Sequence, residues 1–123
     1  MKKHVPDMEK AEQLHNQLQE MLAERRARQT EGVAALHRLL QVAICDTGQS
    51  GVCARFLLGL YNGSEHPFNL VDLRRLDESL HQDCLAVLDL DYMPAQEVHR
   101  YFKGGDRIWR VLAERWGGKP DAR

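Results

Sequence analysis

The chain has 123 residues, of which 17 are Lys or Arg and 18 are Asp or Glu, for a formal net charge of −1. This length suits one domain with one modest hydrophobic core, and the balanced charge excludes a global field that would draw the protein onto DNA or an anionic membrane. The start at Met1 leads into charged and polar residues rather than a signal segment, and no apolar run approaches about eighteen residues. We therefore expect a cytoplasmic protein without membrane contact.

The first expected element is a long amphipathic helix over residues 7–29, a stretch that contains neither Gly nor Pro. Its apolar residues recur at three- and four-residue steps in a narrow stripe, and the remaining positions are mostly Gln, Glu and Arg. Such a stripe suits a helix that lies on the body of its own chain or one that pairs with a second copy. We assign residues 1–31 to this N-terminal helix. The candidate packing or dimer face comprises Leu14, Leu18, Met21 and Leu22.

Thr30 is expected to cap a second helix, which has a broad apolar face and ends before Gly48. Ser50 is expected to cap a third helix that ends at Asn62-Gly63. The two predicted helices form a hairpin in the core.

Asn69 is expected to cap the next helix, and Asp77 offers an alternative start that would split it in two. Pro94 suits the first turn of a short helix, and Gly104-Gly105 forms a hinge before a last helix capped by Asp106.

No segment alternates apolar and polar residues in the manner of a strand, so the predicted fold is all-α. We expect a single compact bundle of five to seven helices with a long N-terminal amphipathic helix. The helical core domain is assigned to residues 32–117 and a flexible tail to residues 118–123.

Two motifs in the 46–50 turn suggest activities that their surroundings do not favour. Asp46-Thr47-Gly48 matches the tripeptide of aspartic proteases, but those carboxylates work in pairs on loops of β-rich folds, whereas this tripeptide lies between two helices. The same hairpin has the outline of a helix-turn-helix, yet its second helix offers Arg55 among mostly apolar neighbours.

Three Cys and several His residues are the side chains of a type that could bind a metal or act in catalysis. Cys45, Cys53 and Cys84 lack paired CxxC spacing and lie in apolar patterns, so we expect buried free thiols. His81 precedes Cys84 by one helical turn, but no third or fourth ligand accompanies them. The sequence therefore predicts no metal, no cofactor and no enzymatic activity. The histidines without an evident catalytic partner at a meaningful spacing are His37, His66 and His99.

Charge is uneven along the chain, because residues 65–91 carry seven acidic and two basic side chains and residues 97–123 carry four acidic and seven basic ones. In one interpretation the two segments lie side by side and pair weakly at the surface. In the other, the basic residues form a face for phosphates or for an acidic protein. That candidate face comprises Arg100, Lys103, Arg107, Arg110 and Arg115.

Two blocks carry a resemblance to a known family: D-T-G-Q-S at residues 46–50 and F-N-L-V-D-L at residues 68–73. Together with their flanks they make residues 36–116 similar to an uncharacterised family of small helical proteins from plasmids, integrative elements and prophages of proteobacteria. The resemblance implies a mobile-element setting and no established activity. Such elements carry accessory proteins that bind host or competitor machinery, including inhibitors of CRISPR defence. By analogy, we expect this chain to be an accessory protein of that kind.

The sequence thus predicts a non-enzymatic protein-interaction module with a protein partner, a homodimer being one form of it. The alternative is a nucleic-acid-associated protein, or a small subunit of a ribonucleoprotein, that binds through the C-terminal basic face. A third hypothesis, an enzyme, requires His66, His99 or Asp46 to meet in one pocket.

Overall fold

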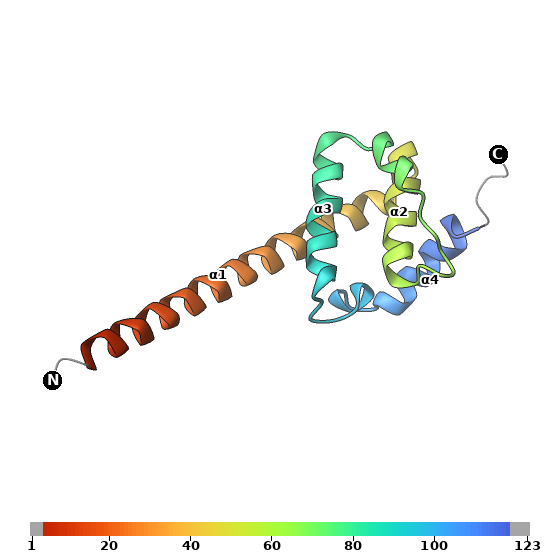
Figure 1. The fold of residues 1–123 in the computed structure, drawn as a ribbon. Coiled ribbons are helices and arrows are strands. Elements are labelled where there is room, and N and C mark those ends of the chain that lie inside the picture. The colour runs from red at the N-terminus through yellow and green to blue at the C-terminus, as the bar shows by residue number, and fades with distance from the viewer. Residues whose placement is uncertain (1–3, 119–123) are drawn as a thin grey trace.

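The computed structural model describes residues 4–118, and over that range the chain forms helices and turns without a strand (Figure 1). The elements in chain order are α1 (His4–Ala43), α2 (Gly48–Tyr61), the 3₁₀ helix η1 (Leu70–Arg75), α3 (Glu78–Tyr92), the 3₁₀ helix η2 (Val98–Tyr101) and α4 (Gly105–Trp116). The predicted all-α class is confirmed, and these elements fall within the predicted five to seven helices. Of the predicted flexible tail, only Gly118 lies within the described range.

The N-terminal helix does not end near residue 29, because α1 continues without a break to Ala43. Thr30 therefore lies in the helix interior and caps nothing, which corrects the expected second helix. The same region contains Gly32, which would ordinarily weaken a helix by about 1 kcal/mol. Here α3 crosses so closely that a Cβ on Gly32 would lie 2.7 Å from the Cβ of Leu90. Packing against α3 thus favours an unbroken helix at a glycine.

The turn between α1 and α2 is closed by Thr47 rather than by Ser50. Thr47 is the N-cap, and Ser50 stands three residues later in a reciprocal capping box. The Ser50 amide donates to Thr47 Oγ1 at 3.1 Å, and the Thr47 amide donates to Ser50 Oγ at 3.0 Å. Gly48 is the first residue of α2 and does not stop the preceding helix. The protease-like tripeptide therefore belongs to a helix-capping turn.

Two predicted caps in the middle of the chain are confirmed. Asn69 accepts a hydrogen bond from the Val71 amide at the start of η1. Asp77 accepts one from the Leu80 amide at 2.9 Å, so a separate helix α3 begins there. Gln49 in the first turn of α2 fixes this second start, because its Oε1 accepts a hydrogen bond from the Asp77 amide at 2.6 Å.

The last two expected boundaries are wrong. No helix begins at Pro94, since η2 starts only at Val98. Asp106 does not cap α4; the cap is Gly104, in the left-handed region at φ 73° and without a side-chain capping bond. A Cβ on Gly105 would overlap the His99 carbonyl oxygen, so this pair of glycines lets the chain fold tightly back on η2.

One hydrophobic core joins the second half of α1 to α2, α3 and α4, and it includes Trp109 on α4, which is 2% exposed. The Trp109 indole N–H donates to the Leu57 carbonyl at 3.1 Å, so its polar atom is satisfied in the interior. The other large side chains of the core that are almost fully buried include Leu36, Leu39, Leu57, Leu58 and Leu112.

Two of the three expected buried thiols are buried, Cys53 and Cys84. Burial raises the pKa of Cys53 to about 11 and that of Cys84 to about 12, which keeps both in the thiol form. Cys45 is exposed, because α1 has ended at Ala43 and the chain there turns toward solvent. The expectation of burial was wrong at that position.

Candidate functional site

The most distinctive feature of the molecule is the first part of α1, which extends away from the helical body as an isolated rod (Figure 1). Every residue from 7 to 31 is exposed, and the first buried residue is Gly32. We call residues 7–31 the projecting segment. At 1.5 Å per residue it reaches roughly 38 Å from the body.

The projecting segment presents large apolar side chains to solvent. Met8 is 67% exposed, Leu14 66%, Leu18 51%, Met21 63% and Leu22 37%. An isolated exposed Leu is ordinary on a protein surface, but a contiguous row along one helix is typical of a contact surface. The predicted packing or dimer face is therefore not covered by the described part of its own chain.

This row continues the core-facing stripe of α1. Heptad spacing places Leu18 and Leu39 at equivalent positions, and Leu14 and Ala35 likewise. Leu39 and Ala35 are fully buried against the body, whereas Leu18 and Leu14 are uncovered. A straight helix drifts about 20° per heptad, so the two halves of the stripe share one broad side of α1. We call the uncovered half the apolar stripe: Ala11, Leu14, Leu18, Met21 and Leu22.

Charge along the projecting segment changes sign. Residues 7–24 hold five acidic side chains and Lys10, whereas the next four residues include Arg25, Arg26 and Arg28. Asp7 and Arg25 occupy stripe positions at its two ends. The apolar stripe is thus bounded by an acidic residue at the tip, the N-terminal end of the projecting segment, and by a basic residue at the root, the end that joins the body.

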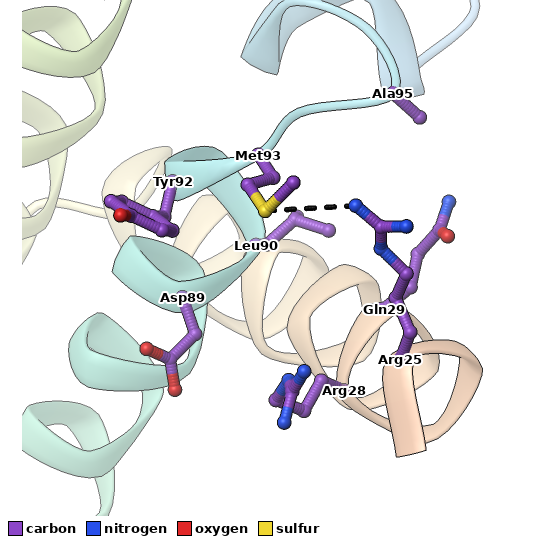
Figure 2. A pocket seen from close by; sticks show the side chains of 8 residues that line it. All are labelled: Arg25, Arg28, Gln29, Asp89, Leu90, Tyr92, Met93 and Ala95. Carbon is purple, nitrogen blue, oxygen red and sulfur yellow. Dashed lines mark hydrogen bonds between the residues drawn. The ribbon is translucent and has the colours of Figure 1, made fainter. Parts of the chain in front are cut away.

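A pocket of about 390 Å³ lies where the projecting segment leaves the body (Figure 2). Arg25 reaches across it from α1, and its Nη2 lies 3.6 Å from the Met93 sulfur at the end of α3. Tyr92 beside it is 83% exposed. The lining residues are Arg25, Arg28, Gln29, Asp89, Leu90, Tyr92, Met93 and Ala95. Sequence reasoning missed this pocket, because it depends on α1 continuing past residue 29 to meet α3.

The structure does not gather all five residues of the predicted basic face. Arg100, Lys103, Arg107 and Arg110 are exposed along η2, the following turn and α4. Arg115 lies about 140° around the α4 axis from Arg110.

Arg115 belongs to a different contact, at the turn after α1. It donates to the Ile44 carbonyl at 3.2 Å and lies 3.8 Å from the Asp46 carboxylate. Glu114 adds an exposed acidic group on α4 between the positions of Arg107 and Arg110. The exposed basic surface is therefore smaller than predicted and mixed in sign.

A second, shallow pocket of about 290 Å³ lies between the end of α2 and α4. His66 lines it, and the buried His99 places Nε2 3.2 Å from the carboxylate of Asp106, another lining residue. Asp46 lies elsewhere, with Arg115. Two of the three groups in the enzyme hypothesis thus lie near one pocket and the third does not join them.

His81 and Cys84, which the sequence disfavours as metal ligands, belong to no metal-binding group among the described residues. Over residues 4–118, no three His, Cys, Asp or Glu side chains lie close enough together to hold a metal ion. None of the helices in that range is both long and apolar enough to cross a membrane.

A protein-family model, described as a family of unknown function (DUF7673), matches residues 33–117. No curated protein and no solved structure shows a significant match to the chain. The matched range begins one residue after Gly32, where burial begins, so it covers the helical body and leaves the projecting segment outside. Because the match spans more than half of the sequence, the chain belongs to the DUF7673 family of unknown function.

Proposed function

We propose that this protein is a non-enzymatic interaction module, in which a helical body carries a projecting helix that binds protein through its apolar stripe. The observation that carries the proposal is the exposure of that stripe, together with its continuity with the buried face of α1. Burying a Leu or Met side chain stabilises a complex by about 1.5–3 kcal/mol, so a row of them supports specific association.

The setting we propose is a bacterial mobile element, with a partner in host or competitor machinery such as CRISPR defence. The resemblance of the D-T-G-Q-S and F-N-L-V-D-L blocks to proteins of plasmids, integrative elements and prophages supports this setting. A soluble partner in the cytoplasm fits the balanced charge of the chain.

The experiment is affinity capture from a bacterial lysate with the tagged full-length protein and two matched triple variants. The stripe variant carries Leu14→Ser, Leu18→Ser and Met21→Ser, all at exposed positions whose replacement leaves the body intact. The control variant carries three Ser substitutions on the opposite side of the same helix, at Gln13, Asn16 and Gln19.

The stripe variant loses helix propensity at three positions and the control variant at two, a small difference, and only the stripe variant removes apolar side chains. A protein whose capture persists after nuclease treatment should bind the native chain and the control variant but not the stripe variant. Equal capture by both variants would refute the proposal.

The second candidate is nucleic-acid binding through Arg100, Lys103, Arg107 and Arg110, which the exposure of these four side chains favours. Phosphate contacts release counterions, so such binding would weaken steeply as salt rises from 50 to 200 mM. The Arg107→Ala, Arg110→Ala double variant should then lose affinity for a short duplex or single strand. Binding that does not depend on these residues, or none at low salt, removes this candidate.

A further inference from the structure

We infer that the apolar stripe is covered by a second copy of this chain, with the two projecting segments packed antiparallel so that Leu14 of each faces Leu18 of the other. The inference rests on the proposed function in taking the stripe as a protein-binding surface, and it makes a second copy of this chain, rather than a host or competitor protein, the protein bound there. It follows from how the apolar and charged side chains of one projecting segment match those of another placed against it in reverse.

The apolar matches extend beyond the two central layers. In an antiparallel pair, each of the two core positions of the heptad in one helix faces the other core position in the second helix. When Leu14 faces Leu18, Ala11 therefore lies opposite Met21 of the second copy. At the flank of the seam, Met8 of one copy comes beside Leu22 of the other. The large apolar side chains that are exposed on the projecting segment thereby all gain an apolar neighbour.

The charges match in the same register. Asp7 comes opposite Arg25 of the second copy, and Lys10 comes beside Glu24 of the second copy. Two-fold symmetry repeats each of these pairs, so one dimer contains four opposite-charge pairs at the ends of its apolar seam. Complementary charge at the ends of a seam fixes its direction and register.

The competing arrangements bring like charges or mismatched side chains together. A parallel pair in register would place Asp7 against Asp7, Arg25 against Arg25 and Arg28 against Arg28. Shifting the antiparallel pair by one heptad would set Leu14 against Arg25 in one direction and Leu18 against Asp7 in the other. Only the register proposed above keeps the apolar layers together and the charges complementary.

The ends of this pair also fit the shape of the body. The bodies lie at opposite ends of the antiparallel rod, and the tip of each projecting segment reaches the root of the other. Arg25, the residue opposite Asp7, also lines the pocket at that root, where it contacts the exposed Met93 (Figure 2). The N-terminal end of the second copy's projecting segment therefore meets this pocket at the guanidinium group of Arg25.

The test is a charge exchange in the full chain, with the association constant measured by analytical ultracentrifugation. Asp7→Arg turns both Asp7–Arg25 pairs of the dimer into repulsions, and we expect the association constant to fall roughly tenfold. Adding Arg25→Asp restores opposite charges, and the association constant should return to within about threefold of the original. In a parallel dimer, Asp7→Arg would only exchange one like-charge pair for another and would leave the association constant nearly unchanged.

A crosslinking experiment fixes the register independently of charge. In a Cys45→Ser background, which removes the exposed native thiol, one sample carries Lys10→Cys and another carries Glu24→Cys. The mixed sample should form a disulfide-linked dimer on mild oxidation, whereas Lys10→Cys alone should not, because its two thiols would be about 21 Å apart along the rod. Circular dichroism checks that each variant keeps the helix content of the native chain.

Failure of this inference is distinguishable from failure of the proposed function. A native chain that stays monomeric to 100 µM, or a dimer that ignores the charge exchange and does not crosslink between positions 10 and 24, overturns the inference. In that case, loss of a captured protein by the stripe variant, with retention by the control variant, would still support the proposed function. If the stripe variant loses neither self-association nor a captured protein, both are refuted.

Discussion

Arg38 on α1 forms a bidentate ion pair with Asp83 on α3, with Nε 3.1 Å from Oδ2 and Nη2 2.9 Å from Oδ1. Asp83 is 6% exposed, so its carboxylate depends on this guanidinium for most of its polar contacts. The pair lies six residues beyond Gly32 on α1 and links α1 directly to α3. It therefore fixes the orientation of α1, and hence the direction in which the projecting segment leaves the body.

We predict that Asp83→Ala lowers the free energy of unfolding by about 1–2 kcal/mol. Removal of the carboxylate leaves the guanidinium of Arg38 without its main acceptor, and the cost stays moderate because the Arg38 side chain is half exposed. Glu31→Gln is the control, since Glu31 contacts the same Arg38 at 3.1 Å but is exposed. It should change the free energy by less than about 0.5 kcal/mol. Denaturant titration of both variants tests this, and equal effects would contradict the assigned role of Asp83.

Gly32 should resist replacement even by Ala. Ala favours a helix interior by about 1 kcal/mol over Gly, so an exposed site would gain stability. At Gly32, however, the new methyl group meets the Cβ of Leu90 and the carbonyl of Ala86, atoms that no change of rotamer can move. The helices must separate, and overpacking of this kind costs about 1–3 kcal/mol. We expect a net loss in Gly32→Ala.

Gly48→Ala provides the matched comparison, because nothing lies within 4 Å of a Cβ built there. Its thermal midpoint should stay level or rise slightly. If Gly32→Ala melts no lower than the native chain, the close crossing of α1 and α3 is not a constraint on stability.

The sequence was a good guide to where apolar faces lie and a poor guide to where helices join. Thr30 has the chemistry of a cap, but a cap forms only where the backbone leaves the helix, and contact with α3 at Gly32 favours continuation. Thr47 and Ser50 are both good caps three residues apart. Which of them starts the helix depends on where the preceding helix ends, and sequence pattern fixes that point only within a few residues.

The candidate site was predictable in its residues and not in its surroundings. The apolar stripe follows directly from the spacing of Leu14, Leu18 and Met21. Whether the body folds back over that stripe is a tertiary question, and the spacing is the same in either case. The basic face was overestimated for a related reason, since Arg110 and Arg115 are near in sequence but point to different sides of α4.

Asp77 gives the fold a defined dependence on pH. Hydrogen bonds from the Leu80 amide, then from the Ser79 hydroxyl, lower the pKa of the Asp77 carboxyl in the folded state. Because the folded pKa lies below the unfolded one, the stabilisation is fully present above the unfolded pKa of about 4 and is lost as the pH falls through the folded pKa. We predict that Asp77→Asn, which keeps a capping side chain, loses less stability than the native chain as the pH falls below about 4.

Asp91 should show the opposite dependence of stability on pH, because burial raises the pKa of its carboxyl and the negative charge of the nearby Glu97 raises it further. A raised pKa means that the folded state binds the proton more tightly, so protonation of Asp91 favours folding. Asp91→Asn should therefore raise the free energy of unfolding at pH 7, whereas Asp77→Asn should not. Chemical denaturation at several pH values compares the two, and identical pH profiles would contradict both assignments.

The three thiols should react in two distinct classes. Cys45 is exposed and should react within minutes at pH 8 with a chromogenic disulfide reagent, because the reagent can reach its sulfur. Cys53 and Cys84 are fully buried, and their raised pKa values leave almost no thiolate. One thiol should react in the native protein and all three after denaturation, and Cys45→Ser should abolish the fast phase. A fast phase that persists in Cys45→Ser would mean that α2 and α3 separate readily, and the body would then be too mobile to hold α1 in one direction.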